Sequence, residues 1–536
     1  GGAVFAVLIT AKGWAGMGSD LEAPQLAQAL GHFRGLRTGS DVRGQVRAGD
    51  GPALAAGLDA VSMFCLGAGF VQWLRRRQGD GTDDLHTPLC VAVGRDPRVH
   101  GPGLLAAFAE GCASVGNTSL TDVGLATTPA MFEACVDTVG YFDRTVGPGP
   151  AHAGAAMVTA SHLPAEWNGV KFFTPDGGLG SEDVRHICDL AAVTYTLLPS
   201  SATAEPSSTL GTTPTMLGTA TTAPGAAATM PGAPPALPPH LRTDPGYLTQ
   251  GYACVLRDRV LGGADLRGLR IVVNAGHGAA GFIAHDVLGP LRADVSASLF
   301  LEPDGRFPAH APNPEDPDAV AATLEQVRVA RADLGLIFDP DVDRSGLVLG
   351  AAGAGAPLAV TRNRLVALMS AVVLREYPGS VVVTDSVTSE GLTRYIERAG
   401  GVHVRAKKGY RTVIAEGQRI DADPALPACH LAMETSGHGA VKGNAWLDDG
   451  AYTALRIVRL AASEGGVAGL RALLGPLEEP LESVEVRLRV RPAQGQAEVA
   501  RVCDRVAEAM ARAAAGPVRR WEPDPVQPEG FRVRVR

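Results

Sequence analysis

Three aspartates at alternate positions offer the most distinctive chemistry in this sequence. They lie in FDPDVDR, residues 338–344, directly after the apolar run LGLIF. Alternating carboxylates in an extended loop can converge on one hard cation, because such cations prefer oxygen ligands. An EF-hand is excluded, since Arg344 and Gly350 stand where that loop needs Gly and Glu. The alternatives are a solvated acidic turn and a magnesium site, and the position after a buried strand favours magnesium held by Asp339, Asp341 and Asp343.

A serine follows a second apolar run. Residues 155–158 (AAMV) have the pattern of a strand, and Ser161 lies just past its end in TASHLP. Active groups of α/β sheets gather at such strand ends. Magnesium binds few carboxylates together with a phosphate oxygen, which a phosphorylated Ser161 could supply. Lys171 follows in NGVK. Taken alone, the serine segment is more typical of a Ser-His pair in a surface loop.

Other polar segments could bind a phosphorylated sugar. ETSGH, residues 434–438, combines a carboxylate, a hydroxyl and an imidazole, as a polyol ligand requires. Arginine offers paired donors to phosphate oxygens. Three basic segments could therefore hold phosphate, although each alone is also typical of a solvated surface: SDVRG (40–44), GRDPR (94–98) and RAKKGYR (405–411).

Composition excludes several classes of function. The net charge of −8 over 536 residues argues against general nucleic-acid binding, which needs a basic surface. The apolar runs are shorter than the roughly 20 residues that span a bilayer. Eight scattered cysteines without a CxxC pair favour buried free thiols in a reducing compartment. We expect neither nucleic acid nor a membrane among the partners.

Strand and helix patterns alternate in the middle of the chain, which predicts α/β layers with largely parallel sheets. The predicted strands are Arg270–Asn274, Leu334–Phe338, Ser380–Thr384 and Val402–Val404, and the predicted helices are Asp318–Ala330 and Arg364–Arg375. The segment GHGAAG, residues 276–281, fits GxGxxG. A dinucleotide site also needs an acidic residue about 20 positions later. Asp286 comes too early and Asp294 is only tolerable, so a tight strand-to-helix turn is favoured over a dinucleotide-dependent oxidoreductase.

Two stretches interrupt this pattern. Residues 197–239 are rich in Ala, Thr, Ser, Pro and Gly with almost no charge, which is typical of a disordered insertion. After Pro480 the pattern becomes a strand (Ser483–Arg491), a helix (Glu498–Ala515) and a strand (Phe531–Val535). We therefore predict five regions: 1–196 with the serine loop, the insertion 197–243, 244–358 with the acidic loop, 359–480 with the sugar loop, and 481–536 as an incomplete α+β domain.

The order of the segments resembles the α-D-phosphohexomutase superfamily, the phosphoglucomutases and phosphomannomutases. The resemblance runs from about Leu36 to the C-terminus, and it rests on GSDVRG, GRDPR, TASHLP, NGVKFF, DPDVDR, RAKKGYR and ETSGH. The residues of the segments GSDVRG, TSEGL and ETSGHGA look closest to those of a plant and algal branch. This branch implies a chloroplast (plastid) location, with the cytoplasm as the alternative.

The family fold implies three consecutive α/β domains around a central cleft and a smaller α+β domain. The resemblance implies an isomerase of carbohydrate metabolism that interconverts sugar 1-phosphate and sugar 6-phosphate of glucose, mannose or both. It implies a phosphoserine, one Mg²⁺ per active site, a sugar bisphosphate intermediate and activation by glucose 1,6-bisphosphate. Alternatives are a phosphoglucosamine or N-acetylglucosamine-phosphate mutase and a non-catalytic sugar-phosphate-binding paralogue. The expected state is a monomer or dimer.

The resemblance also assigns roles to residues. The catalytic group comprises the phosphoserine Ser161 with Arg43, His162, Lys171 and His438. The substrate-binding group comprises Arg344, Lys407, Arg411, Glu434, Ser436 and His438. The metal ligands are Asp339, Asp341, Asp343 and the phosphate on Ser161. Two departures stand out: Leu163 replaces a frequent Asn, and residues 481–536 lack the phosphate-binding loop that the fourth domain of the family carries.

Overall fold

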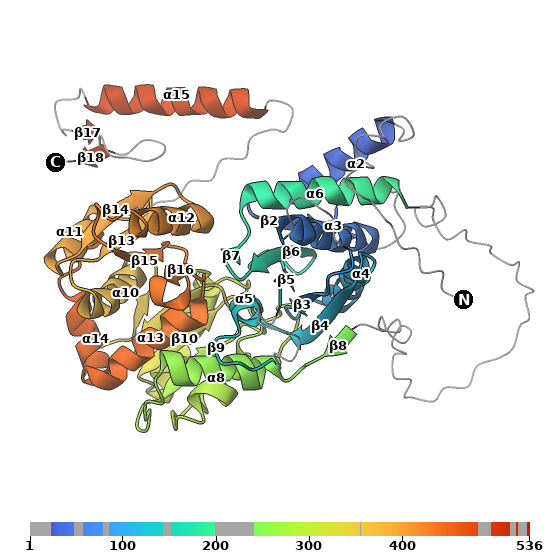
Figure 1. Ribbon diagram of the computed structural model, residues 1–536. Coiled ribbons are helices and arrows are strands. Elements are labelled where there is room, and N and C mark those ends of the chain that lie inside the picture. The colour runs from blue at the N-terminus through green and yellow to red at the C-terminus, as the bar shows by residue number, and fades with distance from the viewer. Residues whose placement is uncertain are drawn as a thin grey trace, which may run out of the picture. The chain divides into compact units, whose positions relative to one another are not determined.

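The computed structural model describes residues 23–47, 57–78, 85–142, 152–198, 241–353, 355–480, 495–514, 521–523 and 533–535. The chain divides into two compact units (Figure 1). The first unit comprises residues up to 126 together with 131–247, and the second comprises 127–130 together with 248 onward.

An eight-stranded mixed sheet forms the centre of the first unit. Its strand order is β1-β2-β6-β5-β3-β4-β8, and β7 pairs with β6. The pairs of β3 with β4 and with β5 are parallel, whereas β6 is antiparallel to both β5 and β2. The strands are β1 (Arg37–Thr38), β2 (Asp41–Gln45), β3 (Leu89–Arg95), β4 (Thr118–Leu125), β5 (Gly154–Val158), β6 (Trp167–Thr174), β7 (Gly177–Gly178) and β8 (Leu241–Thr243).

Helices pack together to form the core of this unit with the sheet (Figure 1). Helices α3 and α4 approach so closely that a Cβ at Gly67 would collide with the carbonyl oxygen of Phe108. Phe70 and Phe172 join helix and sheet, with ring centroids 4.9 Å apart. The helices are α2 (Ala23–Leu36), α3 (Ala60–Gln78), α4 (Gly101–Ala113) and α6 (Ser181–Thr196), whereas α5 (Thr128–Val136) has its first three residues assigned to the second unit.

Strand β8 corrects one predicted boundary. Residues 241–243, which we had assigned to the low-complexity insertion, form β8 and pair in parallel with β4, Leu241 opposite Leu120. Three residues carry too short a pattern to be recognised, because their pairing with β4 defines the strand. Residues 199–240, most of the predicted insertion, lie outside the described residues.

The second unit contains two four-stranded sheets. The first has the order β12-β11-β10-β9, with β9 and β10 parallel and the other pairs antiparallel. Helix α9 packs on it through Ala319 and Val327. Its elements are η2 (Tyr247–Tyr252), α8 (Ala253–Val255), η3 (Leu256–Val260), β9 (Ile271–Asn274), η4 (Ile283–Leu288), α9 (Pro317–Ala330), β10 (Leu334–Phe338), β11 (Ser345–Leu349) and β12 (Leu358–Val360).

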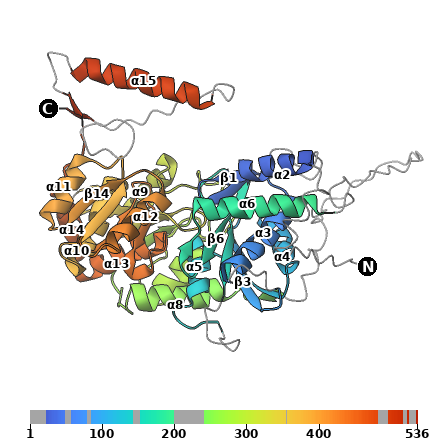
Figure 2. The same ribbon diagram turned by 45° about the horizontal axis from the view of Figure 1, so that its top comes forward.

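The other sheet has the order β14-β13-β15-β16, and only β16 runs antiparallel to its neighbour. Helix α12 packs against β13, β14 and β15. Figure 2 shows α12 beside β14. The elements are α10 (Asn363–Glu376), β13 (Val381–Asp385), α11 (Glu390–Arg398), β14 (Val402–Ala406), α12 (Tyr410–Asp421), β15 (Cys429–Met433), β16 (Gly439–Val441), η5 (Lys442–Asn444), α13 (Gly450–Ser463) and α14 (Gly466–Leu474).

The described C-terminal elements are α15 (Gly495–Ala514) and an antiparallel pair, β17 (Trp521–Pro523) with β18 (Val533–Val535). The helix predicted over Glu498–Ala515 is confirmed, whereas the strand predicted over Ser483–Arg491 lies outside the described residues. The α/β prediction is also confirmed, with mixed sheets. All eight cysteines are free, and none of the described helices is long and apolar enough to cross a membrane.

Candidate active site

Ser161 lies in a strained loop directly after β5. Its φ angle is 51°, in the left-handed region that non-glycine residues rarely adopt, and its exposed fraction is 1%. Its N–H donates to Thr159 Oγ1 at 2.8 Å, and its Oγ lies 3.4 Å from His162 Nδ1. Such strain persists only where the surroundings hold the backbone, as they do at many functional sites.

Arg98 provides that support. This fully buried side chain donates to Asp96 Oδ2 at 3.0 Å and to Ser161 O at 2.6 Å. Its further acceptors are the carbonyl oxygens of Leu163, Pro164 and Trp167. The guanidinium donors are thus engaged inside the protein. Arg98 therefore shapes the serine loop, and the phosphate role predicted for the segment GRDPR stays a prediction for its other arginine, Arg95.

Two other predicted residues lie on strands beside this loop. Arg43, on β2, donates to Asp41 Oδ2 at 2.7 Å and contacts Ala160 O at 3.5 Å. Lys171, on β6, pairs with Met157 on β5 and is only 4% exposed. The first unit thus places Arg43 and Lys171 on strands next to the serine loop and His162 within it, while their catalytic roles stay predictions.

The predicted metal ligands converge in the second unit. Asp339, Asp341 and Asp343 follow β10, each has no exposed surface, and one oxygen from each lies within 4.8 Å of the others. Val342, a β-branched residue, has a φ of 61°, an unusual value that marks a tightly constrained loop. The alternating spacing therefore does bring the three carboxylates to one point.

The charges in this loop are only partly balanced by the protein. Arg344 donates to Asp339 Oδ2 at 3.1 Å and lies 3.9 Å from Asp343 Oδ1. Burial, followed by the charges of Asp343 and Asp341, raises the pKa of Asp339 well above its ordinary value. A cation held by the three carboxylates would relieve this repulsion. An all-oxygen set of buried carboxylates fits a hard divalent cation such as Mg²⁺.

The predicted sugar loop is the turn between β15 and β16. Glu434 N–H donates to His438 O at 2.9 Å, and Gly437 has a φ of 95°, which glycine adopts without strain. Ser436 Oγ lies 3.2 Å from Glu434 Oε2 and 2.9 Å from His438 Nδ1. The three predicted sugar ligands therefore form one hydrogen-bonded group.

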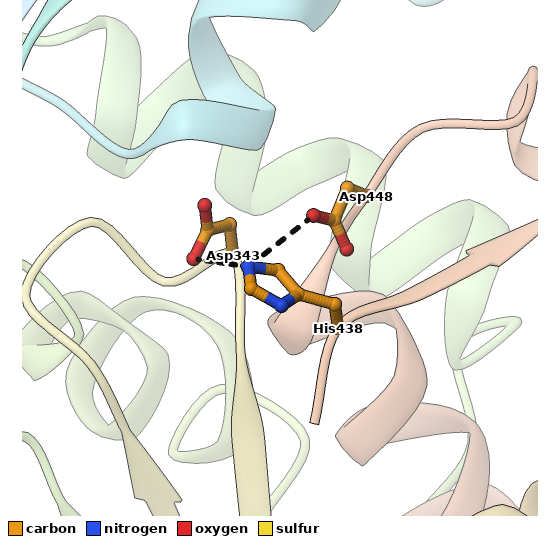
Figure 3. Close-up of side chains that lie close together, drawn as sticks. All are labelled: Asp343, His438 and Asp448. Carbon is orange, nitrogen blue, oxygen red and sulfur yellow. Dashed lines mark ion pairs between the residues drawn. The ribbon is translucent and has the colours of Figure 1, made fainter. Parts of the chain in front are cut away.

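Carboxylates surround the His438 imidazole. Its Nε2 lies 3.7 Å from Asp343 Oδ1 and 3.7 Å from Asp448 Oδ2, and Figure 3 shows the ring between these two side chains. Its Nδ1 lies 3.5 Å from Glu434 Oε2. Burial lowers the pKa of His438, but the charges of Asp448 and Asp343 outweigh it and raise the pKa to about 10.

Backbone contacts join the sugar loop to the acidic loop. Arg344 and His438 form an isolated antiparallel bridge, and Gly450 N–H donates to Val342 O at 3.1 Å. A Cβ at Gly437 would collide with Ser345 O. These backbone contacts therefore fix the position of the proposed sugar ligands relative to the proposed metal ligands.

The third basic segment reaches the sugar loop through its backbone. Gly409 N–H donates to Glu434 Oε1 at 2.6 Å, and the Tyr410 ring stacks on His438 with centroids 5.1 Å apart. Lys407 and Arg411 flank this contact. Arg405 contacts Glu390 at 3.1 Å, so a phosphate role for this arginine is not supported.

Family models match three consecutive parts of the chain. They are the α/β/α domains I, II and III of phosphoglucomutase/phosphomannomutase, at residues 35–194, 254–353 and 361–476. The chain belongs to the phosphoglucomutase/phosphomannomutase family. It is a hexose-phosphate mutase, an isomerase that moves a phosphoryl group within a sugar phosphate, as the sequence predicted.

Relatives of this mutase agree. It is 28% identical over 427 residues to a phosphomannomutase/phosphoglucomutase of Pseudomonas syringae pv. tomato. The matched region covers 79% of this chain and 76% of the relative. It is 26% identical over 377 residues to a phosphoglucomutase of Neisseria gonorrhoeae, covering 70% and 67%.

Solved structures are similar in fold. A phosphoglucomutase/phosphomannomutase family protein of Burkholderia thailandensis superposes with a TM-score of 0.64 at 24% identity, over 94% of this chain and 88% of that one. The open form of the Paramecium phosphoglucomutase pp63/parafusin gives a TM-score of 0.57 at 15% identity, over 89% and 82%.

The candidate site also contains residues that had no role predicted from the sequence, although residues 447–450 resemble the family. Asp448 faces His438, Thr128 donates to Asp341, and Asp385 Oδ2 accepts a hydrogen bond from Thr435 at 2.7 Å. The adjacent acids 448 and 449 before a helix were a usable signal, since such residues cap helices. Because the serine loop belongs to the first unit and the acidic loop to the second, the predicted approach of Ser161 to the aspartates stays a prediction.

Proposed function

We propose that this mutase interconverts the 1-phosphate and 6-phosphate of glucose, of mannose or of both, through a phosphate carried on Ser161 and a sugar bisphosphate intermediate. The observation that carries the proposal is the buried acidic loop, in which three carboxylates with no exposed surface converge within 4.8 Å. A buried cluster of like charges is costly unless a cation compensates it. Phosphoryl transfer needs such a cation beside the transferred group.

Mg²⁺ is the proposed cation, held by Asp339, Asp341, Asp343 and an oxygen of the Ser161 phosphate. When bound, it supplies charge neutralisation for the transferred phosphoryl group. Arg344 keeps its positive charge against Asp339 in this arrangement, at 3.1 Å. Its proposed contact with substrate therefore adds to a structural one.

The side chains of the protein carry out the remaining steps of phosphoryl and proton transfer. A sugar hydroxyl attacks the phosphorus on Ser161, the bond between phosphorus and Ser161 Oγ breaks, and a bisphosphate forms. After the bisphosphate turns over, its other phosphate returns to Ser161 Oγ. Arg43 and His162 flank the serine, and the proton of the attacking hydroxyl goes to Lys171 or to His438. Both side chains are largely buried, beside the serine loop and within the sugar loop respectively. His438 can accept the proton only when a cation bound to Asp343 offsets the negative charge that otherwise keeps the imidazole protonated.

Glu434, Ser436 and His438 are the proposed sugar ligands, and Lys407 and Arg411 the proposed phosphate ligands of the second unit. The hydrogen bond from Gly409 N–H to Glu434 ties the two groups together. These ligands must accept the sugar in two orientations, because each phosphate in turn has to reach Ser161.

A mutase assay with glucose 1-phosphate, primed with glucose 1,6-bisphosphate, tests the proposal. Intact-mass analysis should find one added phosphate, and peptide mapping should place it on Ser161. Ser161→Ala should abolish turnover, and Asp341→Ala should remove metal-dependent activity with the fold retained. Phosphate on another residue, or turnover by Ser161→Ala, would refute the phosphoserine route.

Parallel assays with mannose 1-phosphate, glucosamine 1-phosphate and N-acetylglucosamine 1-phosphate decide the sugar. A preference for either amino sugar would replace the glucose and mannose proposal without changing the phosphoserine route. Binding of the sugar phosphates without any turnover would instead favour a non-catalytic paralogue. The plant and algal branch, the plastid location and a monomeric or dimeric state stay predictions.

A further inference from the structure

Thr128 makes two hydrogen bonds to the middle aspartate of the acidic loop. Its N–H donates to Asp341 O at 2.8 Å, and its Oγ1 donates to Asp341 Oδ2 at 2.7 Å. Thr128 is 3% exposed and Asp341 has no exposed surface, so water does not compete for these contacts. The two residues are 213 positions apart in the sequence, and both belong to the second unit.

The local sequence explains why the Thr128 side chain is directed to this contact. Thr127 precedes α5, and its Oγ1 accepts the N–H of Ala130 at 3.1 Å, as an N-cap residue does. Pro129 follows, and proline is favoured in the first turn of a helix. With Thr127 as the cap, Thr128 is the first helical residue, and its N–H and hydroxyl both bind Asp341.

The three carboxylates of the acidic loop have different neighbouring side chains. Arg344 donates to Asp339, and His438 lies 3.7 Å from Asp343. Asp341 is held by the neutral hydroxyl of Thr128. Hydrogen bonds of this type orient the ligands of metal sites, and their loss commonly weakens metal binding.

We propose that Thr128 is a positioning residue of the metal site: its hydroxyl fixes the orientation of the Asp341 carboxylate and so raises the affinity of the acidic loop for a divalent cation. The inference rests on the proposed function only in taking the three aspartates as metal ligands. Thr128 acts through Asp341. Removal of the Thr128 hydroxyl should therefore change the affinity for the metal directly, and contacts with the sugar only indirectly.

The test is calorimetric titration of the whole protein with Mn²⁺, without sugar phosphate. Thr128→Val removes the hydroxyl and keeps the shape, and it should weaken Mn²⁺ binding about tenfold. Thr128→Ser keeps a hydroxyl and should bind Mn²⁺ nearly as wild type does. Ser370→Ala is the control: Ser370 is fully buried and donates to Val366 O at 2.7 Å, so this variant also loses a buried hydroxyl but should bind Mn²⁺ normally.

Equal Mn²⁺ affinity of folded Thr128→Val and wild type would overturn the inference while leaving the metal site intact. Loss of affinity in Ser370→Ala of the same size would also overturn it, because the effect would then follow stability. If the valine variant does not fold, the smaller Thr128→Ala decides the matter in the same way. Absence of Mn²⁺ binding by wild type, with no change in Asp341→Ala, would refute the metal site itself and the inference with it.

Discussion

The serine loop and the sugar loop are held by opposite kinds of group. In the serine loop a single buried cation, Arg98, donates to four carbonyl oxygens. In and beside the sugar loop buried carboxylates accept instead: Glu434 from Gly409, Asp385 from Thr435 and Asp448 from Gly439. A guanidinium keeps its charge at any working pH, whereas a buried carboxylate with a raised pKa, such as Asp385, loses its charge as the pH falls. The nucleophile loop should therefore be insensitive to pH, and the sugar loop should respond to it.

Removal of the Arg98 guanidinium should have the largest effect of the substitutions that test this difference between the two loops. Arg98→Met leaves Asp96 as an uncompensated buried charge and four carbonyls without their donor, and it should cost about 3–5 kcal/mol of unfolding free energy. Urea unfolding measures the loss, and intact-mass analysis should show that phosphate no longer accumulates on Ser161.

Arg34→Met is the control for Arg98→Met. The Arg34 side chain is 50% exposed and pairs with Asp189, so its loss should leave the unfolding free energy nearly unchanged. Wild-type stability of Arg98→Met would show that backbone geometry alone holds the serine loop.

Asp385 sharpens the pH difference between the loops. Burial raises the pKa of this carboxyl to about 6, although the hydrogen bond from Thr435 lowers it. The folded protein therefore binds this proton more tightly than the unfolded chain, whose pKa is near 3.8. The charged form costs stability above about pH 6, and this cost disappears as the pH falls from about 6 to about 4. Between pH 4 and 7, this carboxyl should change the unfolding free energy of wild type by up to about 3 kcal/mol, and Asp385→Asn should remove this change.

The measurement is the unfolding free energy of wild type and Asp385→Asn between pH 4 and 7. Asp294 is the control, because hydrogen bonds from Ser296 and Arg270 lower its pKa to about 2. Its contribution is lost only below pH 4, so Asp294→Asn should leave the slope between pH 4 and 7 unchanged. Parallel curves for wild type and Asp385→Asn would contradict the assignment to Asp385.

The sequence predicted the groups whose chemistry is local. The three aspartates are close in the chain, and their spacing after a buried strand was enough to find them. The role of Arg98 could not be predicted in this way, because the sequence does not show whether an arginine in a loop binds a phosphate or backbone carbonyl oxygens. Thr128 and Asp341 meet across 213 positions, and only folding brings them together. Strand β8 was missed because its pairing with β4 defines it.

The smallest expected effect concerns the charge of Asp448. Asp448→Asn can still accept the N–H of Gly439, which now donates to Oδ1 at 2.9 Å, but it removes the negative charge 3.7 Å from His438 Nε2. The imidazole should then be less firmly oriented toward the sugar, and kcat/KM should fall about tenfold with little change in stability. Steady-state assays and urea unfolding measure the two quantities.

The neighbouring acid is the matched control, because it performs the structural task without facing the imidazole. Asp449 caps α13 through Tyr452 N–H and accepts the Tyr252 hydroxyl at 2.8 Å. Asp449→Ala removes both acceptor oxygens, so it should lower stability by about 1 kcal/mol and leave kcat/KM close to wild type. Opposite responses of the two substitutions would show that the acids at 448 and 449 divide orientation of the imidazole from support of the helix. The same response from both would mean that Asp448, too, acts only by stabilising the loop.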